Sequence, residues 1–176
     1  PQARRANSGL ELAQLDYIDF VVQGEGEVTF SELIERTGQD EEIDFCPGVI
    51  LKQKGRVVDC GDRPLIADLS VLPFTDFEGF NFSQYLEPFR LPVSFSRGCP
   101  NRCIFCNEKS YWRQFRSRKA KDVFLEIKSQ TQKIKGIDYI DFHDSLINGN
   151  IVELEKFCDL VIADRLKVRW GAQAAI

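Results

Sequence analysis

The sequence has no methionine and only one histidine, His143, among its 176 residues. Because not even an initiator methionine is present, we expect the chain to be a piece of a longer protein. No apolar run approaches the roughly 20 residues that a membrane helix needs. The first residues, PQARRANSGLELAQ, lack the charged-then-apolar order of a secretory signal. These absences predict a cytoplasmic protein without a membrane segment.

An excess of positive charge is also lacking. The net charge of −4 argues against a general nucleic-acid-coating role but leaves room for a local basic patch. Hydrophobic residues make up 43% and charged residues 28%, which is typical of a soluble globular protein rather than a disordered one. The length suffices for one ordinary domain, or for one domain and part of another.

Cysteines are few and unevenly placed. Cys46, Cys60 and Cys158 are scattered, whereas three others lie within residues 99–106. A disulfide-rich secreted domain would be shorter and would spread its cysteines along the chain. A disulfide framework is therefore disfavoured. We expect Cys158 to be a buried apolar residue on a helix, and Cys46 and Cys60 to be reduced thiols.

The first part of the chain predicts one strand and one helix. Residues 17–23, YIDFVVQ, are mostly β-branched and aromatic, which is typical of a strand buried on both faces. A glycine turn follows, and then a helix is predicted over residues 28–36, where apolar side chains recur at roughly helical spacing: Val28, Leu33 and Ile34. One such unit cannot bury its own faces. We expect it to be the last βα unit of an α/β domain.

Residues 39–90 have a different pattern. Two short alternating segments surround Lys54 and Gly55, a pair that indicates a β-hairpin. The following stretch, RPLIADLSVLPFTDFEGFNF, contains prolines and aromatic residues with little periodicity, which suits a linker packed along a domain surface. Its four phenylalanines between residues 74 and 82 imply that the linker is docked rather than free.

From Leu91 onward, predicted strands and helices alternate. Strands are expected at 92–96, 137–144 and 166–173, and amphipathic helices at 118–134 and 150–164. The apolar faces of the two helices are expected to include Val123, Ile127, Ile134, Ile151, Leu154, Cys158 and Val161. This alternation predicts parallel pairing by right-handed crossovers, in an α/β barrel or an open doubly wound sheet. In either architecture chemistry gathers at the C-terminal ends of the strands, and the cysteine-rich segment follows the first strand.

Cys99, Cys103 and Cys106 are separated by three residues and then by two. This spacing lets a short irregular loop fold three thiolates around one compact cluster. Bacterial ferredoxins use another spacing and supply further cysteines. Three thiolates would leave one iron of a four-iron cluster open to a substrate or cofactor. The alternative is a zinc-binding or structural module in which His143, also near a strand end, completes the four protein ligands that structural zinc requires.

The motif SRGCPNRCIFC resembles that of the radical S-adenosylmethionine enzymes, which carry this spacing after the first strand of a partial α/β barrel, with an aromatic residue before the third cysteine. Phe105 fills that place. The resemblance implies that Cys99, Cys103 and Cys106 ligate a 4Fe-4S cluster, whose fourth iron chelates S-adenosylmethionine (SAM) near Phe105. It also implies reductive cleavage of SAM to a 5′-deoxyadenosyl radical, and an electron donor such as flavodoxin or ferredoxin.

A longer pattern is similar to the cobalamin-dependent subgroup of that family: DFVVQGEGEVTFSELIE, PGVI, DLSVLPFTDFEGF and the cysteine motif. The resemblance implies that residues 1–38 end a flavodoxin-like cobalamin-binding domain, that 39–90 are a linker with a hairpin, and that 91–176 begin a partial barrel of TIM type. The Asp-x-His-x-x-Gly signature of cobalamin binding is absent from this chain. Cobalamin, and with it methyl transfer, is therefore implied by the resemblance alone, and the substrate is not indicated.

Two further positions have two interpretations each. Asp144 ends a predicted strand, where the family contacts the amino group of SAM, and an anionic acceptor suits an ammonium group. Otherwise Asp144 is a loop residue or a capping residue ahead of the following helix. Gly24 and Gly26 form a tight turn in the simpler interpretation, since their flanking glutamates would repel phosphate. Otherwise they face cobalamin, as turns at this edge of flavodoxin-like sheets do.

A basic stretch interleaved with aromatic residues follows the cysteines: Trp112, Arg113, Phe115, Arg116, Arg118, Lys119 and Lys121. The acidic character of the whole chain favours the solvated start of a helix, with the aromatic side chains packed on the barrel. The alternative is a nucleic-acid-binding strip. On the last predicted strand, Trp170 and Gln173 either line a substrate cavity or pack in the core.

Overall fold

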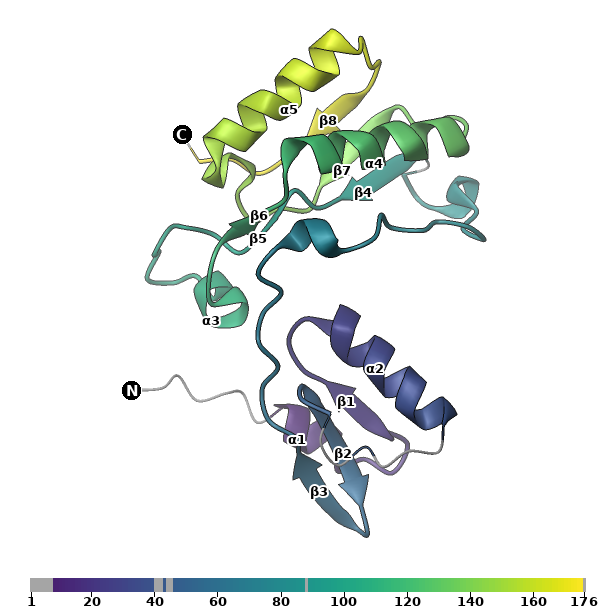
Figure 1. The fold of residues 1–176 in the computed structure, drawn as a ribbon, viewed down its shortest axis with the longest axis vertical. Helices are drawn as coiled ribbons and strands as arrows, with labels where there is room; N and C mark the ends of the chain where they lie inside the picture. Colours follow the sequence, from purple (N-terminus) through teal and green to yellow (C-terminus); the bar gives the residue numbers. More distant parts are fainter. Residues whose placement is uncertain (1–7, 40–42, 44–45, 88, 176) are drawn as a thin grey trace. The chain divides into compact units, whose positions relative to one another are not determined.

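Two compact units make up the chain, Pro1–Ile66 and Ala67–Ile176 (Figure 1). The computed structural model describes four stretches of it: residues 8–39, 43, 46–87 and 89–175. None of the helices within these stretches has both the length and the apolar character needed to cross a membrane.

The first unit contains a three-stranded antiparallel sheet. Its elements are, in order, α1 (Ser8–Leu12), β1 (Phe20–Val22), α2 (Gly26–Gly38), β2 (Val49–Gln53) and β3 (Arg56–Asp59). Strand β2 lies between β1 and β3. The expected strand, helix and hairpin are all present, and the hairpin belongs to the same sheet as the strand before it. Strand β1 is shorter than expected and only partly buried, which corrects the expectation of a strand over residues 17–23 buried on both faces.

The hairpin turn has the conformation that its sequence predicts. Lys54 and Gly55 have φ angles of 50° and 76°. Two successive residues with positive φ are typical of a type I′ turn, whose twist matches that of the flanking strands. Strands β2 and β3 therefore pair in register from Gln53 and Arg56 outward.

Helix α2 buries a different face from the one its apolar residues indicate. Leu33 and Thr29 are buried, whereas Val28 and Ile34 are about half exposed. Arg63 donates a hydrogen bond from Nε to Thr29 Oγ1 at 2.8 Å, which satisfies the buried hydroxyl group. The buried face of α2 thus includes a polar contact between Thr29 and Arg63, where the sequence pattern predicts only apolar side chains.

The second unit is built on a parallel sheet. Strand β7 (Tyr139–Phe142) lies between β4 (Arg90–Val93) and β8 (Arg169–Gly171), and both pairings are parallel. Helices α4 (Ala120–Lys133) and α5 (Ile151–Ala163) lie side by side in this unit (Figure 1). The predicted alternation of strands and helices with parallel pairing is confirmed.

Short elements surround the cysteine segment. Strands β5 (Ser96–Arg97) and β6 (Arg116–Ser117) form a two-stranded antiparallel ribbon, and α3 (Glu108–Trp112) lies between them in the sequence. Three 3₁₀ helices complete the unit: η1 (Leu69–Val71), η2 (Phe82–Gln84) and η3 (Ile147–Gly149).

The core of the second unit lies between the parallel sheet and its two helices. Val123 and Ile127 of α4 are fully buried, as predicted. On α5, Ile151 is about half exposed, which corrects its expected place on the apolar face. The buried residue of α5 is Phe157, whose ring packs edge-on against Phe95 and Phe142, each with 5.7 Å between ring centroids.

The segment before β4 is docked on this core in part. Phe77 and Phe82 pack against it, whereas Phe74 and Phe80 are exposed. Two side chains of α4 hold the backbone of Thr75. The Thr75 amide donates to Glu126 Oε1 at 3.0 Å, and Gln130 Nε2 donates to the Thr75 carbonyl at 2.5 Å.

The structure thus shows a mixed α/β chain. Its contacts group the hairpin with the βα unit before residue 66. The closure of the parallel sheet into a partial barrel, the flavodoxin-like origin of the first unit, and the three regions 1–38, 39–90 and 91–176 stay predictions.

Candidate functional site

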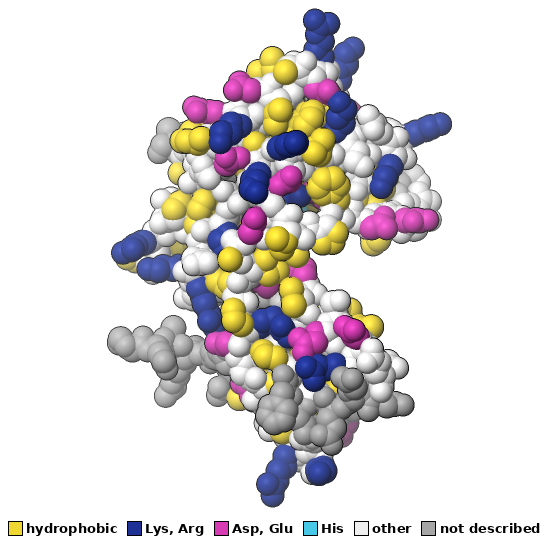
Figure 2. Space-filling model, in the orientation of Figure 1, with side chains coloured by type: hydrophobic (Ala, Val, Ile, Leu, Met, Phe, Trp, Pro, Cys, Tyr) yellow, Lys and Arg dark blue, Asp and Glu magenta, His cyan; other side chains and the backbone are white. Residues whose placement is uncertain are grey.

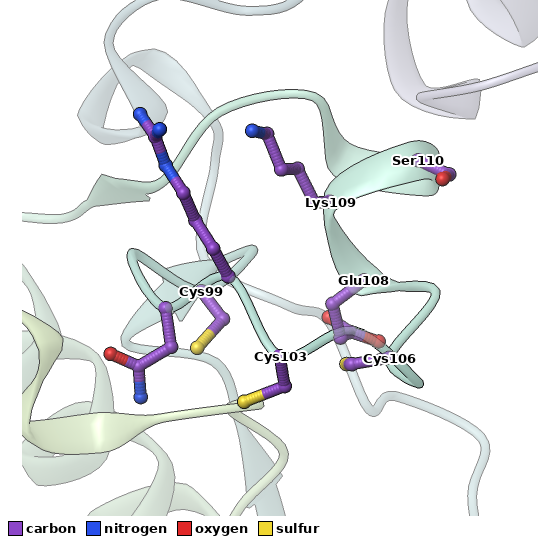
Figure 3. Close-up of a pocket in the computed structure, with 8 residues that line it drawn as sticks. Cys99, Cys103, Cys106, Glu108, Lys109 and Ser110 are labelled. Atoms are coloured by element: carbon purple, nitrogen blue, oxygen red, sulfur yellow. The ribbon is translucent and has the colours of Figure 1, made fainter. Parts of the chain in front are cut away.

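The three clustered cysteines lie on one loop between β5 and α3 and border a cavity of about 360 Å³ (Figure 3). All are free thiols, Cys99 partly buried and Cys103 and Cys106 exposed. The cavity is lined by Cys99, Asn101, Arg102, Cys103, Cys106, Glu108, Lys109 and Ser110. The structure therefore brings the predicted cluster ligands together around an open hollow.

A glycine fixes the start of the loop. Gly98 has a φ of 79°, and a Cβ atom built there would lie 2.8 Å from the carbonyl oxygen of Gln114 and 3.1 Å from Cβ of Trp112. Only glycine combines this backbone conformation with so close an approach. The chain can therefore turn out of the β5–β6 ribbon directly before Cys99.

The apolar residues of the loop point away from the core. Ile104 is fully exposed and Phe105 is 90% exposed. Side chains of this size are normally covered in the functional state, so their exposure fits a loop that contacts another group. The expectation that Phe105 lies beside SAM stays a prediction.

Two positively charged side chains, opposite in sign to thiolates, line the cavity. Arg102 and Lys109 border it, and Lys109 and Ser110 project from α3 (Figure 3). A cluster ligated by three thiolates is net anionic, and nearby cations stabilise it. Glu108, also on the cavity wall, accepts a hydrogen bond from the hydroxyl group of Ser145. The donor set and its charges fit an iron–sulfur cluster.

The zinc alternative receives no support from the geometry. Within the described residues, no three His, Cys, Asp or Glu side chains are grouped so as to hold one metal ion. His143 is not part of the cavity wall, and its Nε2 lies 3.8 Å from Asp141 Oδ2. In a four-iron cluster each cysteine would bind a different iron atom, so the three thiols surround the cluster and do not converge on a single ion.

Asp144 is buried and holds the backbone at the beginning of the cysteine segment. Its Oδ2 accepts from the amide of Phe95 at 3.0 Å, and its Oδ1 accepts from the amide and, at 2.5 Å, from the hydroxyl group of Ser96. Burial raises the pKa of this carboxyl group, and the hydrogen bonds from Ser96 and Phe95 oppose that shift.

Asp144 lies in the loop after β7, as its structural interpretation predicts, but it does not cap the following helix. Helix α5 is capped by Asn150, whose side chain accepts from the amide of Glu153 at 3.3 Å. Asn150 begins the helix six residues after Asp144, so the aspartate lies too early to reach it. Contact of Asp144 with the amino group of SAM stays a prediction.

The basic stretch is the solvated start of a helix only in part: Lys119 and Lys121 are exposed where α4 begins, as expected, whereas two arginines before them are not. Arg116 is buried in β6. Arg118 donates from Nη1 to Glu126 Oε2 at 2.5 Å and to the carbonyl of Ser94 at 3.1 Å, with 11% of its side chain exposed. Arg118, which directly follows the β5–β6 ribbon, is thus a structural residue that holds Glu126 of α4.

Lys and Arg side chains on the visible face lie among Asp and Glu in each unit (Figure 2). That distribution offers no argument for the nucleic-acid alternative. Of the other basic residues in the stretch, Arg113 has a φ of 61° at the end of α3.

The remaining candidates have structural contacts. Gly24 has a φ of 77°, which confirms the tight turn, and Gly26 begins α2. Glu25 between them accepts from the amide of Ile66 at 2.7 Å. Whether either glycine faces cobalamin stays a prediction. Trp170 packs edge-on against Phe142 at 5.7 Å between ring centroids and remains 39% exposed.

Other candidates behave as ordinary structural residues. The Gln173 carbonyl accepts from the amide of Ile147 at 2.9 Å. Cys46 and Cys60 are reduced thiols, as expected. Cys158 is partly buried against the core, and burial raises the pKa of its thiol.

Several residues of the site escape the sequence patterns. Glu108 and Lys109 begin α3, two and three positions after Cys106. Their closeness in sequence to the cysteine motif was a signal that they border the cavity. Ser145 carries no motif signal, since its partner Glu108 lies 37 positions away in the sequence.

Comparison with known proteins identifies relatives over most of the chain, although no family model matches it. The chain is 31% identical over 171 residues to an uncharacterized methyltransferase of Pyrococcus horikoshii, covering 95% of this chain and 37% of that protein. It is 26% identical over 155 residues to the anaerobic magnesium-protoporphyrin IX monomethyl ester cyclase of Synechocystis sp., covering 86% of this chain and 30% of that enzyme.

Solved structures agree with these relatives. The radical S-adenosylmethionine methyltransferase TsrM from Kitasatospora setae superimposes with a TM-score of 0.68 at 20% identity, over 91% of this chain and 32% of that one. Over most of its length the chain therefore has the fold of a radical S-adenosylmethionine (SAM) enzyme. The radical enzyme OxsB of this class gives a TM-score of 0.69 at 19% identity, over 94% of this chain and 24% of that one.

The chain spans about a third of the length of the curated relatives it matches. Structures of TsrM hold cobalamin with a 4Fe-4S cluster, or a SAM analogue with tryptophan, and OxsB holds aqua-cobalamin with SAM. The cofactors expected for this chain are therefore those of its structural neighbours.

Proposed function

We propose that the protein is a radical SAM enzyme in which Cys99, Cys103 and Cys106 hold a 4Fe-4S cluster. One observation carries the proposal: three free thiols border a single open cavity on the loop after the first parallel strand. Relatives of the same class over most of the chain support it. When bound, the cluster would supply the electron that cleaves SAM to methionine and a 5′-deoxyadenosyl radical.

The chain's own residues would prepare this site in three ways. The thiols would bind three irons and leave the fourth iron without a protein ligand. Arg102 and Lys109 would offset the negative charge of the thiolates from the cavity wall. The exposed side chain of Phe105 would cover one side of the bound cofactor and exclude water there.

Cobalamin is the second cofactor that we propose, with methyl transfer or related radical chemistry as the reaction. The likeness to TsrM and OxsB over both units supports it. Gly24 and Gly26, at the turn into α2, are the residues we assign to the cobalamin side. An electron donor such as flavodoxin or ferredoxin and a cytoplasmic location belong to the same proposal.

Anaerobic reconstitution with iron and sulfide tests the cluster. We expect a brown, reducible product with about four irons per chain. Cys103→Ala should lose most of the iron and, in the complete protein, all formation of 5′-deoxyadenosine. Cys60→Ala is the matched control, because that reduced thiol lies outside the loop. A chain that instead binds one zinc ion and releases it on His143→Ala would refute the proposal.

A further inference from the structure

The connection from β7 to α5 contacts the cysteine segment at its beginning. Asp144 accepts three hydrogen bonds from Phe95 and Ser96, the residues just before the loop. Ser96 precedes Cys99 by three positions. The aspartate is 3% exposed. A buried carboxylate that accepts several hydrogen bonds holds its donors firmly in place. A donor that moved away would lose its partner and, being buried, would not gain a hydrogen bond to water.

The next residue of the same connection contacts the end of the segment. Ser145 donates from its hydroxyl group to Glu108 Oε2. Glu108 follows Cys106 by two positions and forms part of the cavity wall. Two adjacent residues thus hold the two ends of one loop, although their partners lie 48 or 49 and 37 positions away in the sequence.

Further along, the same connection supports the loop from behind. A Cβ atom on Gly149 would lie 2.7 Å from the ring of Phe115 and 3.2 Å from Cδ of Pro100, so the backbone of η3 approaches the loop closely. Asn150 donates from Nδ2 to the hydroxyl group of Ser117 at 2.8 Å. Between its fixed ends, by contrast, the loop exposes Cys103.

We propose that Asp144 and Ser145 are positioning residues that fix both ends of the cysteine loop and thereby set the relative positions of its three thiols. The inference rests on the proposed function, since it concerns how the chain presents the cluster ligands. A loop fixed at both ends samples fewer conformations, so less entropy is lost when the thiols close on a cluster. Neither residue needs to touch the cluster for this effect.

Iron release tests the proposal. The reconstituted protein and its variants are mixed anaerobically with a ferrous chelator, and loss of the cluster absorption is followed. Asp144→Asn replaces an acceptor oxygen with a donor, and Ser145→Ala removes the bond to Glu108. We expect each variant to take up about four irons but to release them about tenfold faster, as the loss of a hydrogen bond to a carboxylate predicts. Ser145→Thr keeps the hydroxyl group and should release iron at the wild-type rate.

Two controls separate positioning from general stability. Asp141→Asn changes a partly exposed carboxylate on β7, the strand before this connection, and it should leave release unchanged. Ile127→Ala lowers the stability of the buried core in α4, and it should lower the melting temperature without faster release. Wild-type release rates in Asp144→Asn and Ser145→Ala, or equally fast release in Ile127→Ala, would overturn the positioning role. A wild-type chain that holds no cluster would instead overturn the proposed function.

Discussion

Lys109 places a positive charge beside the proposed cluster. Its side chain borders the cysteine cavity. A cation there stabilises the reduced, more negative cluster, so Lys109→Gln should lower the reduction potential by an amount on the order of tens of millivolts. A redox titration followed by electron paramagnetic resonance measures the shift. Lys135→Gln, an exposed lysine beyond α4, is the control. Equal potentials for both variants would contradict the argument.

The roles of single residues could be predicted from the sequence where they depend on the spacing of residues close together in the chain. Cys99, Cys103 and Cys106 could be chosen from the sequence because one short loop carries all three. Arg118 could not be assigned correctly, because its environment depends on Glu126 and on the carbonyl of Ser94, which tertiary structure supplies. The hold of Ser145 on Glu108 was hidden for the same reason: no local pattern records a hydrogen bond between distant segments.

The β5–β6 ribbon depends on a glycine that no other residue can replace without strain. In Gly98→Ala the new Cβ would approach the Gln114 carbonyl at 2.8 Å with φ at 79°. We expect a loss of about 1–3 kcal/mol in the free energy of unfolding and a lower cluster content. Gly55→Ala is a matched control, since its φ is 76° with nothing within 4 Å. Chemical denaturation compares the two variants, and an equal loss in both would show that the close approach to Gln114 adds nothing.

Helices and strands followed from the sequence more reliably than their partners did. The amphipathic pattern predicts α4 and α5 well, because each buries one apolar face against the parallel sheet. The pattern of residues 17–23 predicts a strand but not its antiparallel neighbour β2, since a strand's residues do not specify what lies beside it. The buried Thr29 was equally hidden, because a hydroxyl group is buried only where a partner such as Arg63 is present.

Because the chain consists of two compact units, we expect the stability of each unit to depend on pH separately. In the first unit, the hydrogen bond from Arg63, together with that from Arg36, lowers the pKa of Glu32 below its ordinary value of 4.5. This pair therefore stabilises the folded state fully above pH 4.5, and the contribution disappears as the pH falls through the lowered pKa.

Glu32→Gln should accordingly cost about 0.5–1 kcal/mol at neutral pH and reduce the acid sensitivity of residues 1–66. Residues 67–176 should keep their wild-type stability. Hydrogen exchange measured by mass spectrometry between pH 3 and pH 7 resolves the two units separately. Glu35→Gln, which removes an exposed carboxylate from the same helix, should leave both profiles unchanged. Destabilisation spread evenly over both units would refute a local effect.

The hold of Asp144 and Ser145 on the cysteine loop also has a consequence for synthesis on the ribosome. The loop emerges before the two side chains that fix its ends, by 37 to 49 residues. At about 5–20 residues per second, several seconds pass in which the thiols are present but unsupported. Insertion of the proposed cluster would therefore follow the synthesis and folding of the second βα unit, and the chain would have to keep the three thiols reduced until then.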